Sequence, residues 1–91
     1  MAKPILMDFY ADWCGPCKTQ NPIIDELKGK FGDKVEFKKI NIDKNHELAR
    51  KYGVLSIPTL IIEVENKIVQ RFTGVTQANV LGDALNKILK S

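Results

Sequence analysis

Cys14 and Cys17 are the residues whose type and spacing most clearly indicate chemistry. They are the only cysteines in the chain, and Gly15 and Pro16 separate them. A disulfide between them would close a loop of four residues. The chain-entropy model assigns such a loop roughly 2 kcal/mol of stabilisation at best. The pair is therefore poorly placed to stabilise a fold and well placed to switch between a dithiol and a disulfide.

Zinc binding is the main alternative use of two cysteines at this spacing. A structural zinc site is tetrahedral and needs four ligands. The chain has one histidine, His46, and no third cysteine, so a zinc site within one chain is disfavoured. Two structural thiols that never react are a further alternative. We expect neither a metal nor an organic cofactor beyond the redox-active pair.

The position of the pair favours a reactive first cysteine. Residues 5–10 have the pattern of a buried strand, and from Cys14 onward the pattern becomes helical. The free N–H groups and the dipole of a helix N-terminus stabilise negative charge and lower the pKa of a thiol there. We therefore expect Cys14 to attack and Cys17, one turn deeper, to resolve the intermediate. Gly15 and Pro16 keep the turn tight and preset the helix start.

Asp8 is a carboxylate within the otherwise apolar first strand, on the same face as Leu6 and Tyr10. Burial without full pairing raises the pKa of a carboxyl group toward neutrality, where it can exchange protons. Lys39 shares a face with apolar residues of the next predicted strand. We predict a coupled Asp8–Lys39 pair behind Cys17, with Asp8 as the proton acceptor. The alternatives are a structural role for Asp8 and a solubilising role for Lys39 at a sheet edge.

Pro58 directly precedes a predicted buried strand, which makes the Ile57–Pro58 bond a candidate for the cis form. About one X–Pro bond in twenty is cis in folded proteins, so the sequence does not decide this point. Trp13, beside the predicted nucleophile, either offers a flat apolar surface to a partner or packs its own loop. We expect His46 to be an ordinary surface residue.

Hydrophobic periodicity predicts the elements that position these residues. The predicted strands cover residues 5–10, 35–42, 59–64 and 68–72, and the predicted helices begin near Cys14, Asn45 and Thr76. The first strand, helix and strand form a right-handed unit with parallel strands, and the last two strands form a hairpin. We therefore predict an α/β fold of order β-α-β-α-β-β-α, with a four-stranded mixed sheet and helices on both faces.

Length and composition exclude several classes of protein. The 91 residues suffice for one domain, which we expect to span 1–91. Hydrophobic residues make up 44% and charged residues 27% of the chain, so the composition is that of a globular protein. A net charge of +3, evenly spread, does not indicate nucleic-acid binding. No apolar run is long enough to span a membrane, and no secretory signal is visible, so we expect a cytoplasmic protein. We expect it to be a monomer.

The sequence resembles the thioredoxin family over nearly its whole length. The resemblance is carried by the segments MDFYADWCGPCK, KINID, SIPTL and FTGV, which follow one another at family-like separations. The WCGPC motif with a downstream IPT is far more specific than two cysteines alone. The resemblance implies a thioredoxin-like fold and a protein-disulfide reductase that acts through a mixed disulfide on Cys14. It also implies disulfide-containing substrate proteins and a thioredoxin reductase as partners.

The resemblance also implies roles for individual residues. It makes Cys14 the nucleophile, Cys17 the resolving cysteine, Asp8 a buried carboxylate and Lys39 its neighbour. It makes Pro58 a cis-proline beside the disulfide. The implied substrate groove consists of Trp13, Ile57, Pro58, Gly74 and Val75, with strand-like backbone bonds at Ile57.

Three features depart from the family pattern. The chain starts at what is usually the second strand, which predicts a barer edge on the strand at 35–42. Tyr10 stands where many members have a second Trp, and Asn66 stands at a common turn Gly.

Three other functions remain open. An oxidase or isomerase is disfavoured by the Gly-Pro dipeptide, and a glutathione-dependent, glutaredoxin-like role fits Trp13 less well. In a pure binding module, partner binding would survive replacement of both cysteines by serine.

Overall fold

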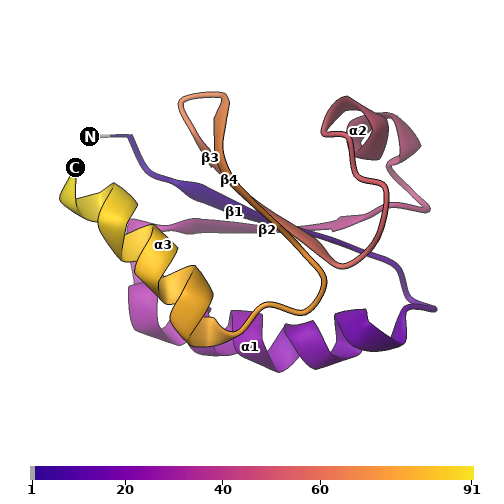
Figure 1. Cartoon of the computed structure of the whole chain (residues 1–91), viewed down its shortest axis with the longest axis horizontal. Helices are drawn as coiled ribbons and strands as arrows, with labels where there is room; N and C mark the ends of the chain where they lie inside the picture. The colour runs from indigo at the N-terminus through magenta and orange to yellow at the C-terminus, as the bar shows by residue number, and fades with distance from the viewer. Residues whose placement is uncertain (1) are drawn as a thin grey trace.

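Four strands and three α-helices make up the fold of the computed structural model, which describes residues 2–91. The strands are β1 (Ile5–Tyr10), β2 (Glu36–Asn41), β3 (Thr59–Val64) and β4 (Lys67–Thr73). The helices are α1 (Gly15–Phe31), α2 (His46–Lys51) and α3 (Ala78–Lys90), and a 3₁₀ turn, η1 (Gly32–Lys34), follows α1. Their order along the chain is the predicted β-α-β-α-β-β-α (Figure 1).

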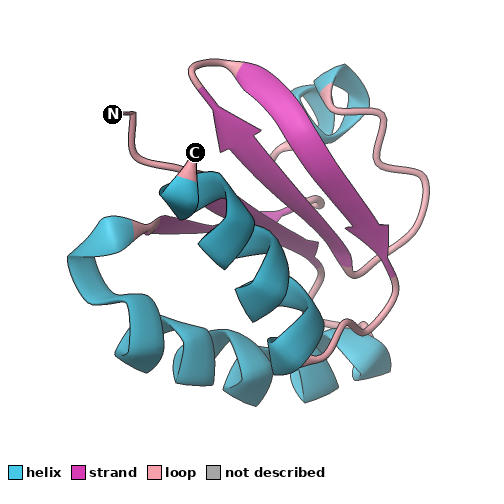
Figure 2. Ribbon diagram, turned by 60° about the vertical axis from the view of Figure 1, so that its left-hand side comes forward, coloured by secondary structure: helices cyan, strands magenta, loops and turns pink. Residues whose placement is uncertain are grey.

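The strands form one mixed sheet in the order β2-β1-β3-β4 (Figure 2). β1 pairs in parallel with β2 and antiparallel with β3, and β3 pairs antiparallel with β4. β1 therefore lies inside the sheet, which explains its nearly continuous apolar sequence. β2 lies at an edge, as the sequence predicted.

The two faces of the sheet carry separate apolar clusters. On one face, Leu6, Leu60 and Ile62 pack with residues of α1 and α3, including Leu27 and Leu85. The other face carries the cluster that includes Phe9, Ile40 and Ile61, against which Leu48 and Tyr52 from the α2 region pack. Figure 1 shows the corresponding layers, with α1 and α3 on one side of the sheet and α2 on the other. Each fully buried side chain of this size contributes about 1.5–3 kcal/mol of transfer free energy.

Helix α1 begins directly after the turn that follows β1. Cys14 is the N-cap residue with extended backbone, and Pro16 lies in the first turn, where its missing N–H costs nothing. Pro22 lies inside the helix. Gly32 ends it with φ at 53°, a backbone angle that glycine adopts without steric cost.

Helix α3 begins later than the sequence predicted. Its N-cap residue is Gln77, one position after the predicted cap. The Thr76 hydroxyl donates to the Gly74 carbonyl at 3.0 Å, and its N–H donates to the Gln20 side chain at 2.8 Å.

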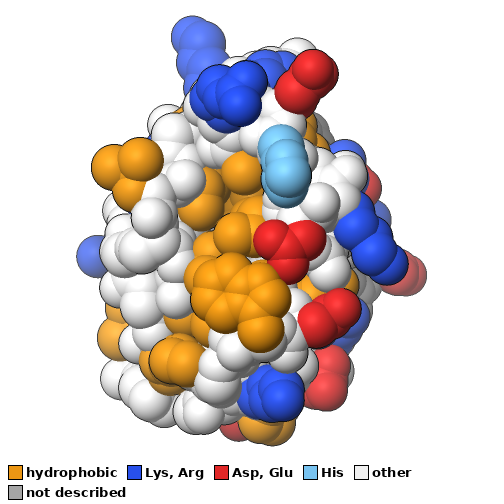
Figure 3. Space-filling view, turned by 90° about the vertical axis from the view of Figure 1, so that its right-hand side faces the viewer, with side chains coloured by type: hydrophobic (Ala, Val, Ile, Leu, Met, Phe, Trp, Pro, Cys, Tyr) orange, Lys and Arg blue, Asp and Glu red, His pale blue; other side chains and the backbone are white. Residues whose placement is uncertain are grey.

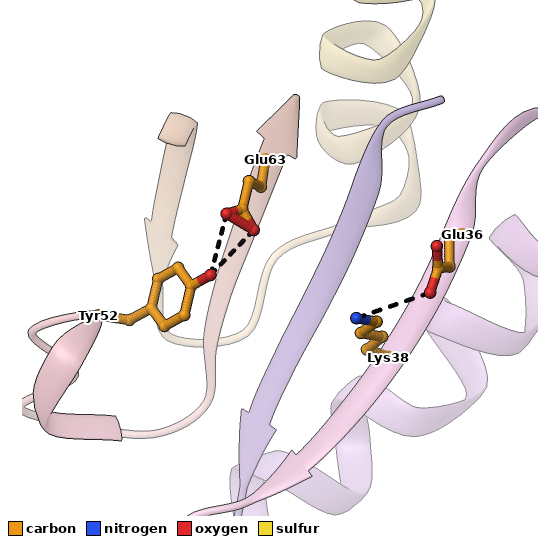
Figure 4. Close-up of polar contacts among 4 residues, drawn as sticks. All are labelled: Glu36, Lys38, Tyr52 and Glu63. Carbon is orange, nitrogen blue, oxygen red and sulfur yellow. Dashed lines mark hydrogen bonds and ion pairs between the residues drawn. The ribbon is translucent and has the colours of Figure 1, made fainter. Parts of the chain in front are cut away.

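The short helix α2 is connected to the sheet through Tyr52. Its hydroxyl lies 2.9 Å from each carboxylate oxygen of the buried Glu63 on β3 (Figure 4). Burial and this hydrogen bond raise the pKa of Tyr52. Figure 4 also shows the ion pair between Glu36 and Lys38 along β2, at 3.7 Å. Both side chains are about half exposed, so this pair contributes less than about 1 kcal/mol.

The β3–β4 hairpin closes through a two-residue loop, Glu65-Asn66, between the paired residues Val64 and Lys67. Both loop residues have positive φ, at 51° and 66°. Two-residue loops with positive φ at both positions follow the twist of the flanking strands. Asn tolerates this backbone conformation better than Glu does.

Candidate active site

Cys14 and Cys17 form a disulfide at the N-terminus of α1, with their Cα atoms 5.3 Å apart. Both side chains are buried, and the Cys17 N–H donates to Cys14 Sγ at 3.2 Å. In the reduced protein the same N–H group points at the sulfur that would carry a thiolate. An N–H donor and a helix dipole at this position both favour a negatively charged sulfur.

Two loops distant in sequence meet beside the disulfide. Ile57 packs against the buried cluster of Ala11, Cys14 and Cys17. The Ile57–Pro58 peptide bond is cis. The Gly74 N–H donates to the Pro58 carbonyl at 2.8 Å and so joins the loop after β4 to the loop before β3.

The loop after β4 is also attached to α1. The buried side chain of Gln20 donates to the Thr76 carbonyl at 2.9 Å and accepts from the Thr76 N–H at 2.8 Å. This pair of bonds determines where Gly74 and Val75 lie relative to the helix that carries the cysteines. Gly74 has φ at 87° and Val75 is exposed.

Trp13 lies on the surface next to the disulfide, with 69% of its area exposed. Its indole N–H donates to Asp43 at 2.8 Å, which orients the ring. A shallow groove of about 330 Å³ extends from the ring and is lined by Trp13, Ile42, Val54, Leu55, Ser56 and Ile57. Figure 3 views this end of the molecule and shows hydrophobic side chains gathered at its centre, with acidic side chains alongside.

Asp8 lies within β1 on the face that packs against α1, and 2% of its area is exposed. Neither carboxylate oxygen has a hydrogen-bond partner among residues 2–91. Burial raises the pKa of Asp8 from 3.8 to about 6, although the positive charges of Lys39 and Lys28 partly oppose the rise. A carboxyl group with a pKa near 6 can accept and return a proton close to neutral pH.

Lys39 is the register partner of Asp8 on β2, but its ammonium group is held by other residues. Nζ donates to Asn21 Oδ1 at 2.8 Å and lies 4.7 Å from the centre of the Tyr10 ring. The predicted coupling between Lys39 and Asp8 is therefore electrostatic in this structure, without a hydrogen bond between the two.

Two polar residues of α1 that organise this region, Gln20 and Asn21, were not predicted from the sequence. Gln20 lies three residues after Cys17 and four before Ile24, so helical periodicity places it on the buried side. A buried amide needs hydrogen-bond partners, and this requirement could have predicted a tertiary contact for Gln20. No comparable signal indicated a role for Asn21, whose partner, Lys39, lies on β2.

The described residues contain no cluster of three or more His, Cys, Asp or Glu side chains that could hold a metal ion. Over the same residues, no helix has both the length and the apolar character needed to cross a membrane.

Known proteins with similar sequences belong to one family. A sequence model of the family described as Thioredoxin matches residues 1–87. Thioredoxin of Bacillus subtilis is 44% identical over 85 residues, which cover 93% of this chain and 82% of the relative. Thioredoxin of Rickettsia felis is 43% identical over 84 residues, which cover 92% of this chain and 80% of the relative.

Solved structures show the same fold. Thioredoxin-2 of the malaria parasite, described as a component of its protein secretion machinery, aligns with a TM-score of 0.91 at 31% identity, covering 94% of this chain and 84% of that one. Fasciola hepatica thioredoxin aligns with a TM-score of 0.86 at 35% identity, and the alignment covers 94% of this chain and 81% of that one. The four-stranded α/β architecture is therefore a thioredoxin-like fold, as predicted. The chain belongs to the thioredoxin family and is a thiol–disulfide oxidoreductase with a redox-active Cys14–Cys17 pair.

Proposed function

We propose that the protein reduces disulfide bonds of other proteins, with Cys14 as the nucleophile and Cys17 as the resolving cysteine. The observation that carries the assignment is the Cys17 N–H bond to Cys14 Sγ at the start of α1. It favours the thiolate at Cys14, and the thiolate is the form that attacks disulfides. Gly15 and Pro16 form the turn that keeps the two sulfurs within reach.

The reaction proceeds in two exchanges. The Cys14 thiolate attacks one substrate sulfur, the substrate S–S bond breaks, and the released substrate thiolate takes a proton from water. Cys17 then loses its proton to the Asp8 carboxylate, and its thiolate attacks Cys14 Sγ in the mixed disulfide. The second substrate thiolate leaves and takes a proton from water, Asp8 returns its proton to water, and the Cys14–Cys17 disulfide remains. The substrate gains two electrons and two protons in total.

The position of Asp8 supports its role as proton acceptor. It is buried on the sheet face that packs against α1, and its pKa of about 6 makes it a mild base at neutral pH. Lys39 tunes that pKa through its charge. A buried carboxylate without hydrogen-bond partners among residues 2–91 reduces stability, and a function in proton transfer accounts for that cost.

The substrate polypeptide docks across Trp13, Ile57, Pro58, Gly74 and Val75 in an extended conformation. Trp13 and Val75 supply exposed apolar surface, and Ile57 lies against the disulfide. Backbone groups of the loop at Ile57 pair with the substrate as an added strand would. Recognition then depends mainly on backbone and shape.

The proposal extends to the partners and the cellular setting of the protein. An external thioredoxin reductase restores the dithiol, and no metal or organic cofactor takes part. The protein acts in the cytoplasm as a monomer, and residues 1–91 function as one domain.

The test is the reduction of insulin by dithiothreitol, with and without the protein. Wild type accelerates the reaction, and Cys14→Ser removes the acceleration, because no thiolate remains to attack. Cys17→Ser is the matched control: it also turns over poorly but accumulates a mixed disulfide on Cys14, visible by mass spectrometry. Folded, reduced wild type without catalysis would refute the proposal and indicate a binding module instead.

A further inference from the structure

The charge that acts most strongly on Asp8 belongs to a lysine with two defined contacts of its own. Lys39 lies on the edge strand β2 and is largely exposed. Its ammonium nevertheless donates to Asn21 Oδ1 at 2.8 Å and lies 4.7 Å from the centre of the Tyr10 ring. Asn21 belongs to α1 and Tyr10 ends β1, so the two contacts come from two different elements.

The surroundings of Asp8 contain few charges that could replace Lys39. Lys39 approaches from β2 and Lys28 from α1. The register partner on β3 is Leu60, which has no ionisable group. Cys17 on α1 is part of the disulfide in the oxidised protein. Among the charged groups around Asp8, Lys39 therefore acts most strongly on its proton, although burial has a larger effect of opposite sign.

A free lysine side chain would not hold its charge in one place. It has four rotatable bonds and about 2 kcal/mol of rotamer entropy, and its ammonium is strongly hydrated. At an edge strand it would move into water, where its attraction for a buried carboxylate weakens with distance and with the higher dielectric. The amide oxygen of Asn21 and the π face of Tyr10 both counteract this movement.

We infer that Asn21 and Tyr10 are positioning residues, which hold the ammonium of Lys39 beside α1, on the side of the sheet where Asp8 is buried, and so set the readiness of Asp8 to accept a proton. The consequence for catalysis rests on the proposed role of Asp8 as proton acceptor. The placement of Asn21 fits such a role, because it lies one helical turn beyond Cys17 on the same side of α1.

The experiment is a ¹³C NMR titration of the Asp8 carboxyl group in the oxidised protein, in which neither thiol titrates. Asn21→Ala should raise the pKa of Asp8 above the wild-type value of about 6 by roughly half a pH unit, as expected when one partly exposed charge pair weakens. Asn21→Ala should fold, because alanine has the highest helix propensity. Asn79→Ala, an exposed position on α3, is the matched control and should leave the pKa unchanged.

Four further variants test whether Lys39 transmits the effect and whether the Tyr10 ring contributes to it. Lys39→Gln should raise the pKa of Asp8 at least as far, and Asn21→Ala added to Lys39→Gln should raise it no further. Tyr10→Leu should raise it as well, whereas Tyr10→Phe, which keeps the ring, should not. The inference is wrong if Asn21→Ala leaves the pKa unchanged or lowers it, or if its effect persists without Lys39.

The pH dependence of insulin reduction separates this inference from the proposed function. If Asn21→Ala shifts the Asp8 titration but not the pH–rate profile, the positioning role stands and the role of Asp8 as proton acceptor fails. If Asp8→Asn alters the profile while Asn21→Ala moves neither quantity, the proposed function stands and the positioning role fails.

Discussion

At the scale of single residues, Asp8 combines burial with a carboxyl group that has no hydrogen-bond partner among residues 2–91. Its pKa rises from 3.8 to about 6 because burial disfavours the charged form more than Lys39 and Lys28 favour it. A native pKa above the unfolded value means that the native state binds more protons between these two values. The contribution of Asp8 to the free energy of unfolding is therefore largest below about pH 4, falls as pH rises from about 4 to about 6, and stays constant above that.

We predict that Asp8→Asn removes this pH dependence. In wild type, the free energy of unfolding should fall by up to about 3 kcal/mol as pH rises from about 4 to 8, and in the variant this fall should disappear. Urea unfolding at a series of pH values measures the effect. Asp25→Asn, an exposed position on α1, is the control and should parallel the wild type. Parallel curves for wild type and Asp8→Asn would show that Asp8 is not the titrating group.

At the scale of elements, the active site depends on hydrogen bonds that join loops to α1. Gln20 bonds both backbone groups of Thr76, and Gly74 bonds Pro58, so the loops before β3 and after β4 keep a constant position beside the cysteines. These bonds connect residues far apart in sequence. They therefore depend on the packing of the helix against the sheet.

Gln20→Met tests this connection. Methionine has a similar length but offers no amide, so the N–H and carbonyl of Thr76 lose their partners. The expected loss of stability is about 1–3 kcal/mol, the cost of unpaired polar groups. Urea unfolding gives that value, and amide hydrogen exchange at Thr76 should accelerate. Unchanged exchange at Thr76 would contradict the proposed connection between this loop and α1.

For the β3–β4 hairpin we predict a substitution that increases stability. Glu65 and Asn66 both have positive φ, which glycine adopts without penalty. Asn66→Gly should raise the free energy of unfolding by roughly 0.5–1 kcal/mol in urea. As a control, Asp83→Gly on the exposed side of α3 should lower it by about 1 kcal/mol. A loss of stability in Asn66→Gly would mean that the Asn66 side chain stabilises the loop.

At the scale of the whole molecule, the disulfide contributes little to the fold compared with the two apolar clusters. These clusters join all four strands to the helices on both faces of the sheet. The disulfide closes a four-residue loop at one end of α1. The protein can therefore change its redox state without rearranging its core, as a carrier that cycles between two forms requires.

We predict that the oxidised and reduced forms differ in the free energy of unfolding by no more than about 2 kcal/mol, the loop-closure value for four residues. Denaturant unfolding with and without excess reductant measures the difference. Cys14→Ser with Cys17→Ser should match the reduced form and show no dependence on reductant. A much larger difference would indicate that the reduced cysteines disturb the packing around Ala11 and Ile57.

The order of elements, the fold class and the position of the dithiol at a helix start could all be predicted from the amino-acid sequence. These features follow from local signals: the alternation in strands, the spacing of apolar residues in helices, and stops such as Gly32. The start of α3 was predicted near Thr76, one position before the observed N-cap Gln77, because local capping preferences locate a helix end only to within a residue or two. The conformation of the Ile57–Pro58 bond was equally undecided by sequence.

The tertiary structure alone decided which polar side chains meet. In the folded protein the Lys39 ammonium contacts Asn21 and Tyr10, and the Gly74 N–H donates to the Pro58 carbonyl. Both Asp8 oxygens lack a hydrogen-bond partner among residues 2–91. Sequence periodicity specifies the face on which a residue lies but not the partner that reaches it from another element. A hydrogen bond depends on distances of a few tenths of an ångström, and these are set only when helix and sheet pack together.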